Sequence, residues 1–350
     1  MASEKSKASG KNAAYDRLRK AIKEKAPARA YLFYGEESYL RQTYVQQLQA
    51  LLIPRGSEDF NLHRLSGSRV TTQDVADAVE SMPMMAPSTL VTVTDWDIFR
   101  LDESQRSQLT ELLEDLPDYC TVVFIYDTVP YKPDRKMKKL TAAIDKNVEV
   151  VEFQGQSRDA LVRWLQKRFR ALGRSIDQQT ADYMLFYCGS MMDNLIGEVN
   201  KVAAFAKAEQ VTAADIAAVA EPVLDARIFD MTNHISARDY NKAAAVLGDL
   251  LRMQTEPIVI LGAIGKELRR LYTARMALDS GKDRFWLMDL WQMRSDYPAR
   301  LLLQAARRVD HAWCKRSLAA CQLLDRRMKS EKNIYREGEL VRFVMELAEQ

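Results

Sequence analysis

A short apolar run that ends at a glycine constrains the fold of this 350-residue chain more than any other segment. The segment reads AYLFYGEESYL over Ala30–Leu40. The aromatic-rich run Tyr31–Tyr34 is typical of a buried β-strand. Beyond Gly35 the chain is briefly polar, and apolar residues then recur near helical spacing. The pattern predicts a strand, a tight glycine turn and a helix, which together form the building unit of α/β domains.

This turn lies where α/β nucleotide-binding proteins hold phosphate groups. A phosphate loop of the G-x-x-x-x-G-K-[ST] kind needs backbone N–H groups that face the phosphate, a lysine, and a hydroxyl for Mg²⁺. Here the turn contains Gly35, Glu36, Glu37 and Ser38, with no lysine and with two carboxylates that repel phosphate. It is either a degenerate, non-binding phosphate loop or an ordinary strand–turn–helix connection, and the spacing alone leaves both open.

Residues 15–153 alternate between strand and helix patterns. Further strands are predicted over Asp59–Leu65, Thr89–Thr94, Tyr119–Tyr126 and Val148–Phe153. Helices are predicted between them, one of them capped by Thr71 and one opening at Pro133. The alternation predicts a parallel sheet with helices on both faces. Residues 1–14 are polar, and we expect them to form a disordered tail.

Strand patterns nearly vanish after Gln154. Residues 154–221 are predicted to form a small helical domain, with helices that begin near Ser157, Asp177, Met191 and Thr212. Residues 222–350 are predicted to be helical again, over Ala226–Ile235, Asp239–Arg252, Pro257–Leu278 and Ala299–Met328. The expected fold class is therefore α/β plus all-α. The order of domains suggests an AAA+ type of module, with a parallel sheet domain and a small helical lid, followed by a C-terminal helical domain.

Composition excludes several classes of protein. The net charge of +3 is too small to require nucleic acid as a partner, although local basic faces remain open. No apolar run approaches the roughly 20 residues of a membrane span, and the N-terminal residues lack the apolar core of a signal peptide. We expect a cytoplasmic protein with no membrane partner. The four cysteines and three histidines show no ligand spacing, so neither a metal nor another cofactor is expected.

Asp95 follows the predicted strand Thr89–Thr94, where a P-loop ATPase carries an acidic residue for Mg²⁺. The following glutamate of a working ATPase is missing, and the turn at Gly35 has no lysine. We therefore interpret Asp95 as a turn or capping residue and expect no ATP hydrolysis.

A methionine-rich loop, SMPMMAP over Ser81–Pro87, follows a predicted helix. Its two prolines favour a stiff, extended segment. Loops are usually polar, yet this one carries Met82, Met84 and Met85. The methionines either pack beneath the loop into the core or form a flexible apolar surface that enters a pocket of a partner.

Two basic clusters lie on predicted helices. The first contains Arg135, Lys136, Lys138 and Lys139, and the second contains Arg269, Arg270 and Arg275. Each is either a solvated helix face or a surface for phosphate-backbone contacts. Neither is interleaved with the aromatic residues that single-strand binders use.

Several segments, taken in order, resemble the delta subunits of bacterial DNA polymerase III, which are clamp-loader subunits. They are YLFYGEESYLR (Tyr31–Arg41), ESMPMMAPSTLVTVTDWD (Glu80–Asp97), CGSMMDNLIGEVNKVAAF (Cys188–Phe205), FDMTNHISARDYNKAAAVLGDLL (Phe229–Leu251) and LLDRRMKSEKN (Leu323–Asn333). The resemblance covers nearly the whole chain from Tyr31 onward. It implies an AAA+ module without ATP binding, followed by a helical collar over 222–350.

The resemblance also implies a partner site. In this family two adjacent apolar residues, on a loop after an early helix, enter a hydrophobic pocket of the sliding clamp. By position these residues are Met84 and Met85, and Met82 is a further candidate. The pair is more commonly Leu-Phe, so this chain lacks the aromatic ring. The resemblance favours the anchor interpretation of the loop over burial.

The function implied by the resemblance is a non-catalytic subunit of the DNA-directed DNA polymerase holoenzyme, which is a nucleotidyltransferase. Such a subunit binds and opens the beta sliding clamp for loading onto primed DNA. Its other implied partners are clamp-loader subunits of the ATPase gamma/tau type and the delta-prime type, bound through the collar. Two alternatives are an active AAA+ ATPase that acts on nucleic acid and a purely structural scaffold. Lys136, Lys138 and Lys139 are possible DNA contacts within the assembled complex.

Overall fold

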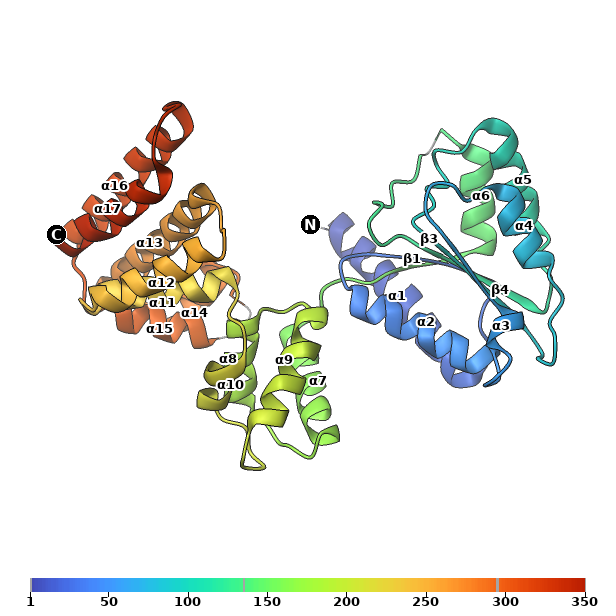
Figure 1. The fold of residues 1–350 in the computed structure, drawn as a ribbon, viewed down its shortest axis with the longest axis horizontal. Coiled ribbons are helices and arrows are strands. Elements are labelled where there is room, and N and C mark those ends of the chain that lie inside the picture. Colours follow the sequence, from blue (N-terminus) through green and yellow to red (C-terminus); the bar gives the residue numbers. More distant parts are fainter. Residues whose placement is uncertain (1, 135, 294–295, 350) are drawn as a thin grey trace. The chain divides into compact units, whose positions relative to one another are not determined.

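The computed structural model describes residues 2–134, 136–293 and 296–349. The chain divides after Gly155 into two compact units, an α/β unit and a helical unit (Figure 1). Each unit has its own hydrophobic cores, so each is described by itself.

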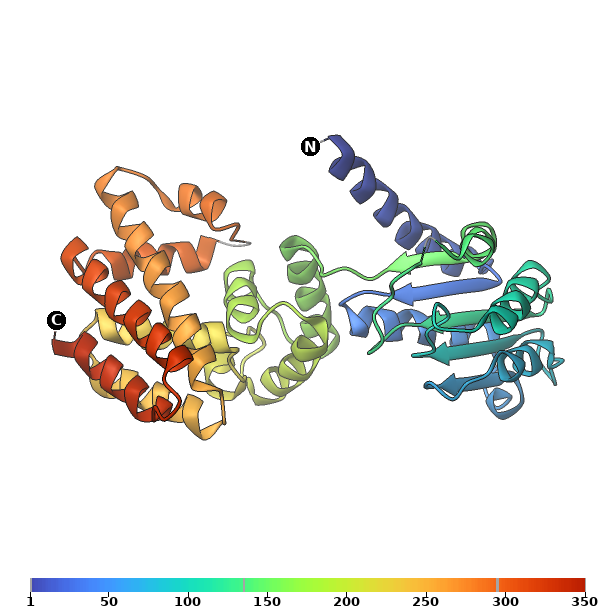
Figure 2. The ribbon, with the colours of Figure 1, turned by 90° about the horizontal axis from the view of Figure 1, so that it is seen from above.

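A five-stranded parallel sheet forms the centre of the α/β unit (Figure 2). The strands are β1 (Ala30–Tyr34), β2 (Leu62–Ser66), β3 (Thr89–Thr94), β4 (Cys120–Ile125) and β5 (Glu149–Glu152). They lie in the order β2-β3-β4-β1-β5. In this order β1 lies between β4 and β5. The turn that follows β1 is therefore at the carboxyl end of the sheet, flanked by a strand on each side.

Alternation along β1 separates two cores. Ala30 and Leu32 face a core that includes residues of α4 (Thr72–Glu80), α5 (Glu103–Glu114) and α6 (Lys138–Asn147). Tyr31 and Phe33 face the other core, which is built with α1 (Ala2–Glu24) and α2 (Ser38–Leu52). Successive side chains of a strand point to opposite faces, and this unit buries both. The prediction of a parallel sheet with helices on both faces is confirmed.

Three local predictions in this unit differ from the structure. Residues 2–14 belong to α1 instead of forming a disordered tail, because residues such as Ala and Lys favour helix and Ala14 and Leu18 bury the helix against the sheet. The first residues of the predicted strand Asp59–Leu65 belong instead to a short helix, α3 (Glu58–Asn61). The side chain of Asn61, at the end of this helix, donates a hydrogen bond to the Met84 carbonyl. The predicted helix at Pro133 begins only at Lys138, since Asp134 forms a turn with Lys136 and Met137.

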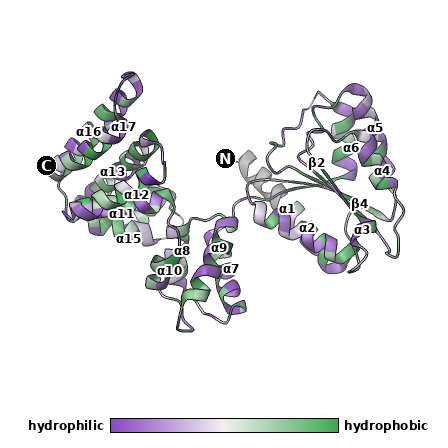
Figure 3. Ribbon diagram, in the orientation of Figure 1, coloured by the Kyte–Doolittle hydropathy of each residue, from purple (hydrophilic) through white to green (hydrophobic). Residues whose placement is uncertain are grey.

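The helical unit begins with α7 (Arg158–Ala171), α8 (Gln178–Cys188), α9 (Met192–Phe205) and α10 (Ala213–Val219). Ser157, Asp177 and Thr212 cap three of these helices, as their sequence positions predict. Helix α7 buries Leu161, Val162, Leu165 and Phe169, and hydrophilic and hydrophobic residues are interspersed along the helices of this unit (Figure 3).

The rest of the unit consists of α11 (Leu224–Ser236), α12 (Tyr240–Arg252), α13 (Pro257–Asp279), α14 (Arg284–Leu290), α15 (Asp296–Ala306), α16 (His311–Ser330) and α17 (Arg336–Glu349). The long helix α13 contributes to two cores, one shared with α16 and α17 and the other with α14 and α15. The prediction of one continuous helix over Ala299–Met328 is wrong, because α15 ends at Ala306 and α16 begins at His311. The N-cap of α16, Asp310, accepts a hydrogen bond from the Trp313 N–H at 2.7 Å. The division of this unit at residues 221 and 222 stays a prediction.

Candidate functional site

The glycine turn after β1 is closed against the backbone of Phe153, the residue that follows β5. Gly35 has φ +120°, and a Cβ placed there would lie 2.4 Å from the carbonyl oxygen of Phe153. The Phe153 N–H donates to the Tyr34 carbonyl at 2.7 Å, and the Glu37 N–H donates to the Phe153 carbonyl at 3.0 Å. Glycine is required here by both the left-handed backbone and the close approach.

Several polar groups of the turn are engaged within the fold. The Glu37 N–H donates to the Phe153 carbonyl, the Ser38 N–H donates to the Glu36 carbonyl at 3.2 Å, and a Glu36 carboxylate oxygen accepts from the Gly155 N–H at 2.8 Å. Arg41, a buried residue of α2, lies beside the turn. It donates to the Gly35 carbonyl and forms an ion pair with Asp127. The positions predicted as a degenerate phosphate loop thus come together as a turn whose polar groups bind one another.

Asp95 holds the loop after β4. One carboxylate oxygen accepts from the backbone N–H groups of Asp127, Thr128 and Val129 at 2.8, 2.9 and 3.1 Å, and the other accepts from the Thr128 hydroxyl at 2.7 Å. Burial alone would raise the pKa of Asp95, but these hydrogen bonds outweigh it and lower that pKa. The interpretation of Asp95 as a turn or capping residue is confirmed.

The methionine-rich loop between α4 and β3 is turned outward. Met85 is 92% exposed, Met82 75% and Met84 55%. The alternative in which these side chains pack into the core is therefore wrong. Exposed apolar side chains gathered on one loop are characteristic of a protein-interaction site. Phe60 of α3 is also exposed, and it directly precedes the residue that binds this loop.

A buried asparagine fixes this loop. The side-chain carbonyl of Asn61 accepts from the Met84 N–H at 2.7 Å, and its amide group donates to the Met84 carbonyl at 2.8 Å and to the Ser57 carbonyl at 2.8 Å. Asn61 is fully buried. Both the N–H and the carbonyl of Met84 are thus bonded to one buried side chain, while the Met84 side chain is exposed.

The next residue adopts an unusual backbone conformation. Met85 has φ +56°, which a side-chain-bearing residue seldom adopts. Such strain is retained where the surrounding structure determines the backbone, and it is common at binding sites. Sequence reasoning found the methionines and missed Asn61, because its contact with Met84 spans 23 residues and leaves no local signal.

The basic residues predicted as possible phosphate contacts differ in their surroundings. Lys136, Lys138 and Lys139 are exposed along a groove that Glu103, Glu111 and Glu114 also line. Arg135 lies outside the described residues. In the helical unit, Arg270 pairs with Glu267 and Arg275 pairs with Asp279, so these two guanidinium groups are engaged within the fold.

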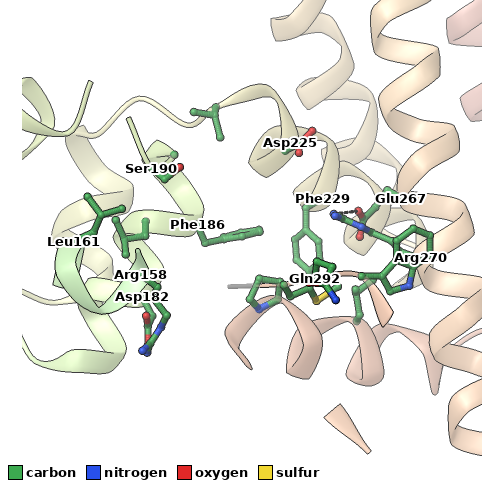
Figure 4. A pocket seen from close by; sticks show the side chains of 17 residues that line it. Arg158, Leu161, Asp182, Phe186, Ser190, Asp225, Phe229, Glu267, Arg270 and Gln292 are labelled. Atoms are coloured by element: carbon green, nitrogen blue, oxygen red, sulfur yellow. Dashed lines mark hydrogen bonds and ion pairs between the residues drawn. The ribbon is translucent and has the colours of Figure 1, made fainter. Parts of the chain in front are cut away.

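A cavity of about 400 Å³ lies within the helical unit, between α8 and helices α11, α13 and α15 (Figure 4). Phe186 and Phe229 both line it, with their rings packed edge to face and 5.2 Å between the centroids, and Glu267 and Arg270 approach it from α13. Burial raises the pKa of Glu267, an effect that the nearby Arg270 partly opposes. Arg270 lies over the Trp291 ring, 5.7 Å from its centroid. These contacts bind one helix to the next, and no arrangement of a nucleophile and a base is apparent among the lining residues.

The described residues contain no group of three or more His, Cys, Asp or Glu side chains arranged to hold a metal ion. All four cysteines are buried free thiols. Burial raises the pKa of Cys188 to about 12 and that of Cys321 to about 11. None of the described helices combines the length and the apolar character that crossing a bilayer requires.

Comparisons with known proteins agree on one family. A family model described as DNA polymerase III, delta subunit matches residues 31–154, and one described as DNA polymerase III delta subunit, C-terminal domain matches residues 225–346. Together the two models cover more than half of the chain.

Individual relatives extend this likeness. The chain is 23% identical over 269 residues to DNA polymerase III subunit delta of Bacillus subtilis, covering 75% of this chain and 77% of that protein. It is 20% identical over 270 residues to the probable DNA polymerase III subunit delta of Aquifex aeolicus, covering 73% of each. The solved Bacillus subtilis DNA clamp loader delta protein matches with a TM-score of 0.51 and 19% identity, covering 96% of this chain and 100% of that one. This structural likeness supports the predicted fold class.

Proposed function

Because the chain belongs to the DNA polymerase III delta subunit family, we propose that it binds the sliding clamp and opens it for loading onto primed DNA. The proposed contact is the methionine-rich loop, with Met84 and Met85 as anchors and Met82 beside them. In this proposal the chain acts as a non-catalytic part of the polymerase holoenzyme, in the cytoplasm.

One observation carries the proposal. Met84 and Met85 are exposed on a loop whose backbone is fixed at Met84 by the buried Asn61. An apolar anchor that is already held in place loses little conformational entropy on binding, so more of its burial energy appears as affinity. Methionine is also adaptable enough to fill a pocket that an aromatic residue fills in relatives.

Opening of the clamp would follow from differential binding. If the loop binds a sprung clamp interface more tightly than a closed one, binding shifts the ring toward the open state by that difference in free energy. The closed turn at Gly35 and the ion pair of Arg41 argue against a nucleotide on this chain. ATP would therefore act through sibling subunits of the gamma/tau and delta-prime types, which residues 222–350 would contact as a collar.

The test is binding of the full chain to the sliding clamp, with the wild type compared with Met84→Ala/Met85→Ala. Hot-spot anchors cost about 1–3 kcal/mol each when truncated, so the double variant should bind at least tenfold more weakly. Its thermal stability should stay close to that of the wild type, because both side chains are exposed in the free protein.

A matched control removes two other exposed methionines, Met253 and Met345, which are 54% and 61% exposed in the helical unit. Met253→Ala/Met345→Ala should leave clamp binding unchanged. Equal binding by the loop variant and the wild type would place the contact elsewhere. A loop variant that loses stability with no specific loss of binding would favour a scaffold.

A further inference from the structure

The α/β unit leaves very few large apolar side chains in solvent, and one of them is an aromatic ring outside the methionine-rich loop. Over residues 13–134 and 136–155, whose side chains the structure describes, the exposed ones are Phe60, Met82, Met84 and Met85. Phe60, the third residue of the short helix α3, is 52% exposed. Apolar residues scattered singly over a surface are ordinary, but these four belong to one loop and to the helix that is bonded to it.

A single buried side chain connects Phe60 to the loop. The Asn61 side chain bonds the N–H and the carbonyl of Met84, at 2.7 and 2.8 Å. Phe60 directly precedes Asn61, so the Cα atoms of these two residues are about 3.8 Å apart. The backbone that carries the Phe60 ring is therefore tied to the backbone that carries the Met84 side chain.

The segment around Phe60 is itself hydrogen-bonded. The Phe60 N–H donates to the Ser57 carbonyl at 3.3 Å, and the same carbonyl accepts from the Asn61 amide group at 2.8 Å. The Ser57 hydroxyl donates to the Pro54 carbonyl at 2.9 Å. Because the backbone is already ordered, burying the ring against a partner costs little conformational entropy.

We propose that Phe60 is a further anchor for the sliding clamp, beside Met84 and Met85. This inference rests on the proposed function, because it assigns another contact residue to the same site. An aromatic side chain buries roughly 150–250 Å² and contributes strongly to interfaces. The surface of the clamp that receives the loop must then offer an apolar depression wide enough for the ring as well as for the methionines.

The test titrates the full chain with purified sliding clamp of the same organism and compares Phe60→Ala with the wild type. Phe60→Ala should bind at least about fivefold more weakly, as expected when an interface anchor is truncated. The matched control is Phe205→Ala, which removes a ring that is 47% exposed in the helical unit and should bind the clamp normally. Both variants should shift the melting temperature by less than about 2 °C, because both rings are exposed.

Two further measurements separate a direct contact from a positioning role. The Met84 N–H should exchange with solvent at the wild-type rate in Phe60→Ala, because Asn61 keeps its hydrogen bonds to the loop. Phe60→Leu, which keeps an apolar side chain on the same backbone, should recover part of the lost affinity.

Four results would overturn the inference. Wild-type binding by Phe60→Ala, together with weak binding by Met84→Ala/Met85→Ala, would do so and leave the proposed function intact. Wild-type binding by both of these variants would also remove the proposed contact at the loop. Faster exchange of the Met84 N–H in Phe60→Ala would show that Phe60 positions the loop. An equal loss of binding in Phe205→Ala would show a general effect of removing an exposed ring.

Discussion

Two loops of the α/β unit treat their functional groups in opposite ways. The turn after β1, around Gly35, bonds polar groups to Phe153 and Gly155, which follow β5, and to its own residues. The loop before β3 anchors its backbone through Asn61 and leaves Met82, Met84 and Met85 in solvent. One loop is closed where a nucleotide would bind, and the other is open where a protein could bind.

The difference shows that the layout of the strands does not by itself determine which loop offers groups to a ligand. In the first loop the backbone N–H groups of Glu37 and Ser38 donate to carbonyl groups of the fold. In the second loop the backbone is satisfied by one asparagine, which frees the side chains for recognition. Both loops have hydrogen-bonded backbone groups, so what separates them is which side chains remain exposed.

The largest expected effect comes from forcing the closed turn open. Gly35→Ala should lower the free energy of unfolding by about 3 kcal/mol. The alanine would have to adopt a positive φ, and its Cβ would also clash with backbone atoms. The Cβ would lie 2.4 Å from the Phe153 oxygen and 2.7 Å from its nitrogen. Denaturant unfolding measures the loss. As a control, Gly67 has φ +89° but nothing within 4 Å of a Cβ, so Gly67→Ala should cost about 1 kcal/mol. Equal costs would contradict the close approach.

The next effect comes from loosening the open loop. Asn61→Ala should cost about 2 kcal/mol of stability, because it leaves polar groups of Ser57 and Met84 without their buried partner. It should also weaken clamp binding, since the loop would then be ordered only on binding. Asn61→Asp should be at least as destabilising, because a buried carboxylate would face two carbonyl oxygens. An Asp variant as stable as the wild type would argue against the bonding pattern, and unfolding with clamp titration measures both effects.

A smaller, pH-dependent effect is expected at Asp95, which binds the loop after β4. Its lowered pKa means that its contribution to stability is present above the usual pKa of an aspartate and is lost as the pH falls through the folded-state pKa. Asp95→Asn should cost about 1–2 kcal/mol at neutral pH and should flatten the acid side of the stability curve. Thermal unfolding over an acid-to-neutral pH series measures this. Asp118→Asn, which removes an exposed partner of Arg29, should change stability by less than about 0.5 kcal/mol.

The smallest expected effect is that of ATP. Millimolar Mg-ATP should leave the melting temperature of the purified chain unchanged, because the closed turn offers it no site. A ligand at a hundredfold excess over its Kd would stabilise the fold by about 2.7 kcal/mol, which a thermal shift measurement readily detects. A clear increase in the melting temperature with Mg-ATP would instead support the alternative of an active ATPase.

Local patterns explain which elements could be predicted. Thr71 and Thr212 form capping boxes at the predicted positions, because a cap depends on residues only three apart. The strand Thr89–Thr94 matches its prediction residue for residue, since a β-branched apolar run has few other uses in a core. The predicted helix at Pro133 and the continuous helix after Ala299 failed because nearby side chains made competing turns and caps.

The sequence by itself determined the alternation of strands and helices, the glycine at the turn, and the placement of three methionines in one loop. Only the tertiary structure decided which of these were buried and which were exposed. The contact between Asn61 and Met84, the ion pair between Arg41 and Asp127, and the approach of Phe153 to Gly35 all join residues far apart in the chain. Secondary structure depends on neighbours within a few residues. Whether a polar group or side chain is exposed depends on which distant residues pack against it in the folded chain. Composition and spacing therefore could not reveal it.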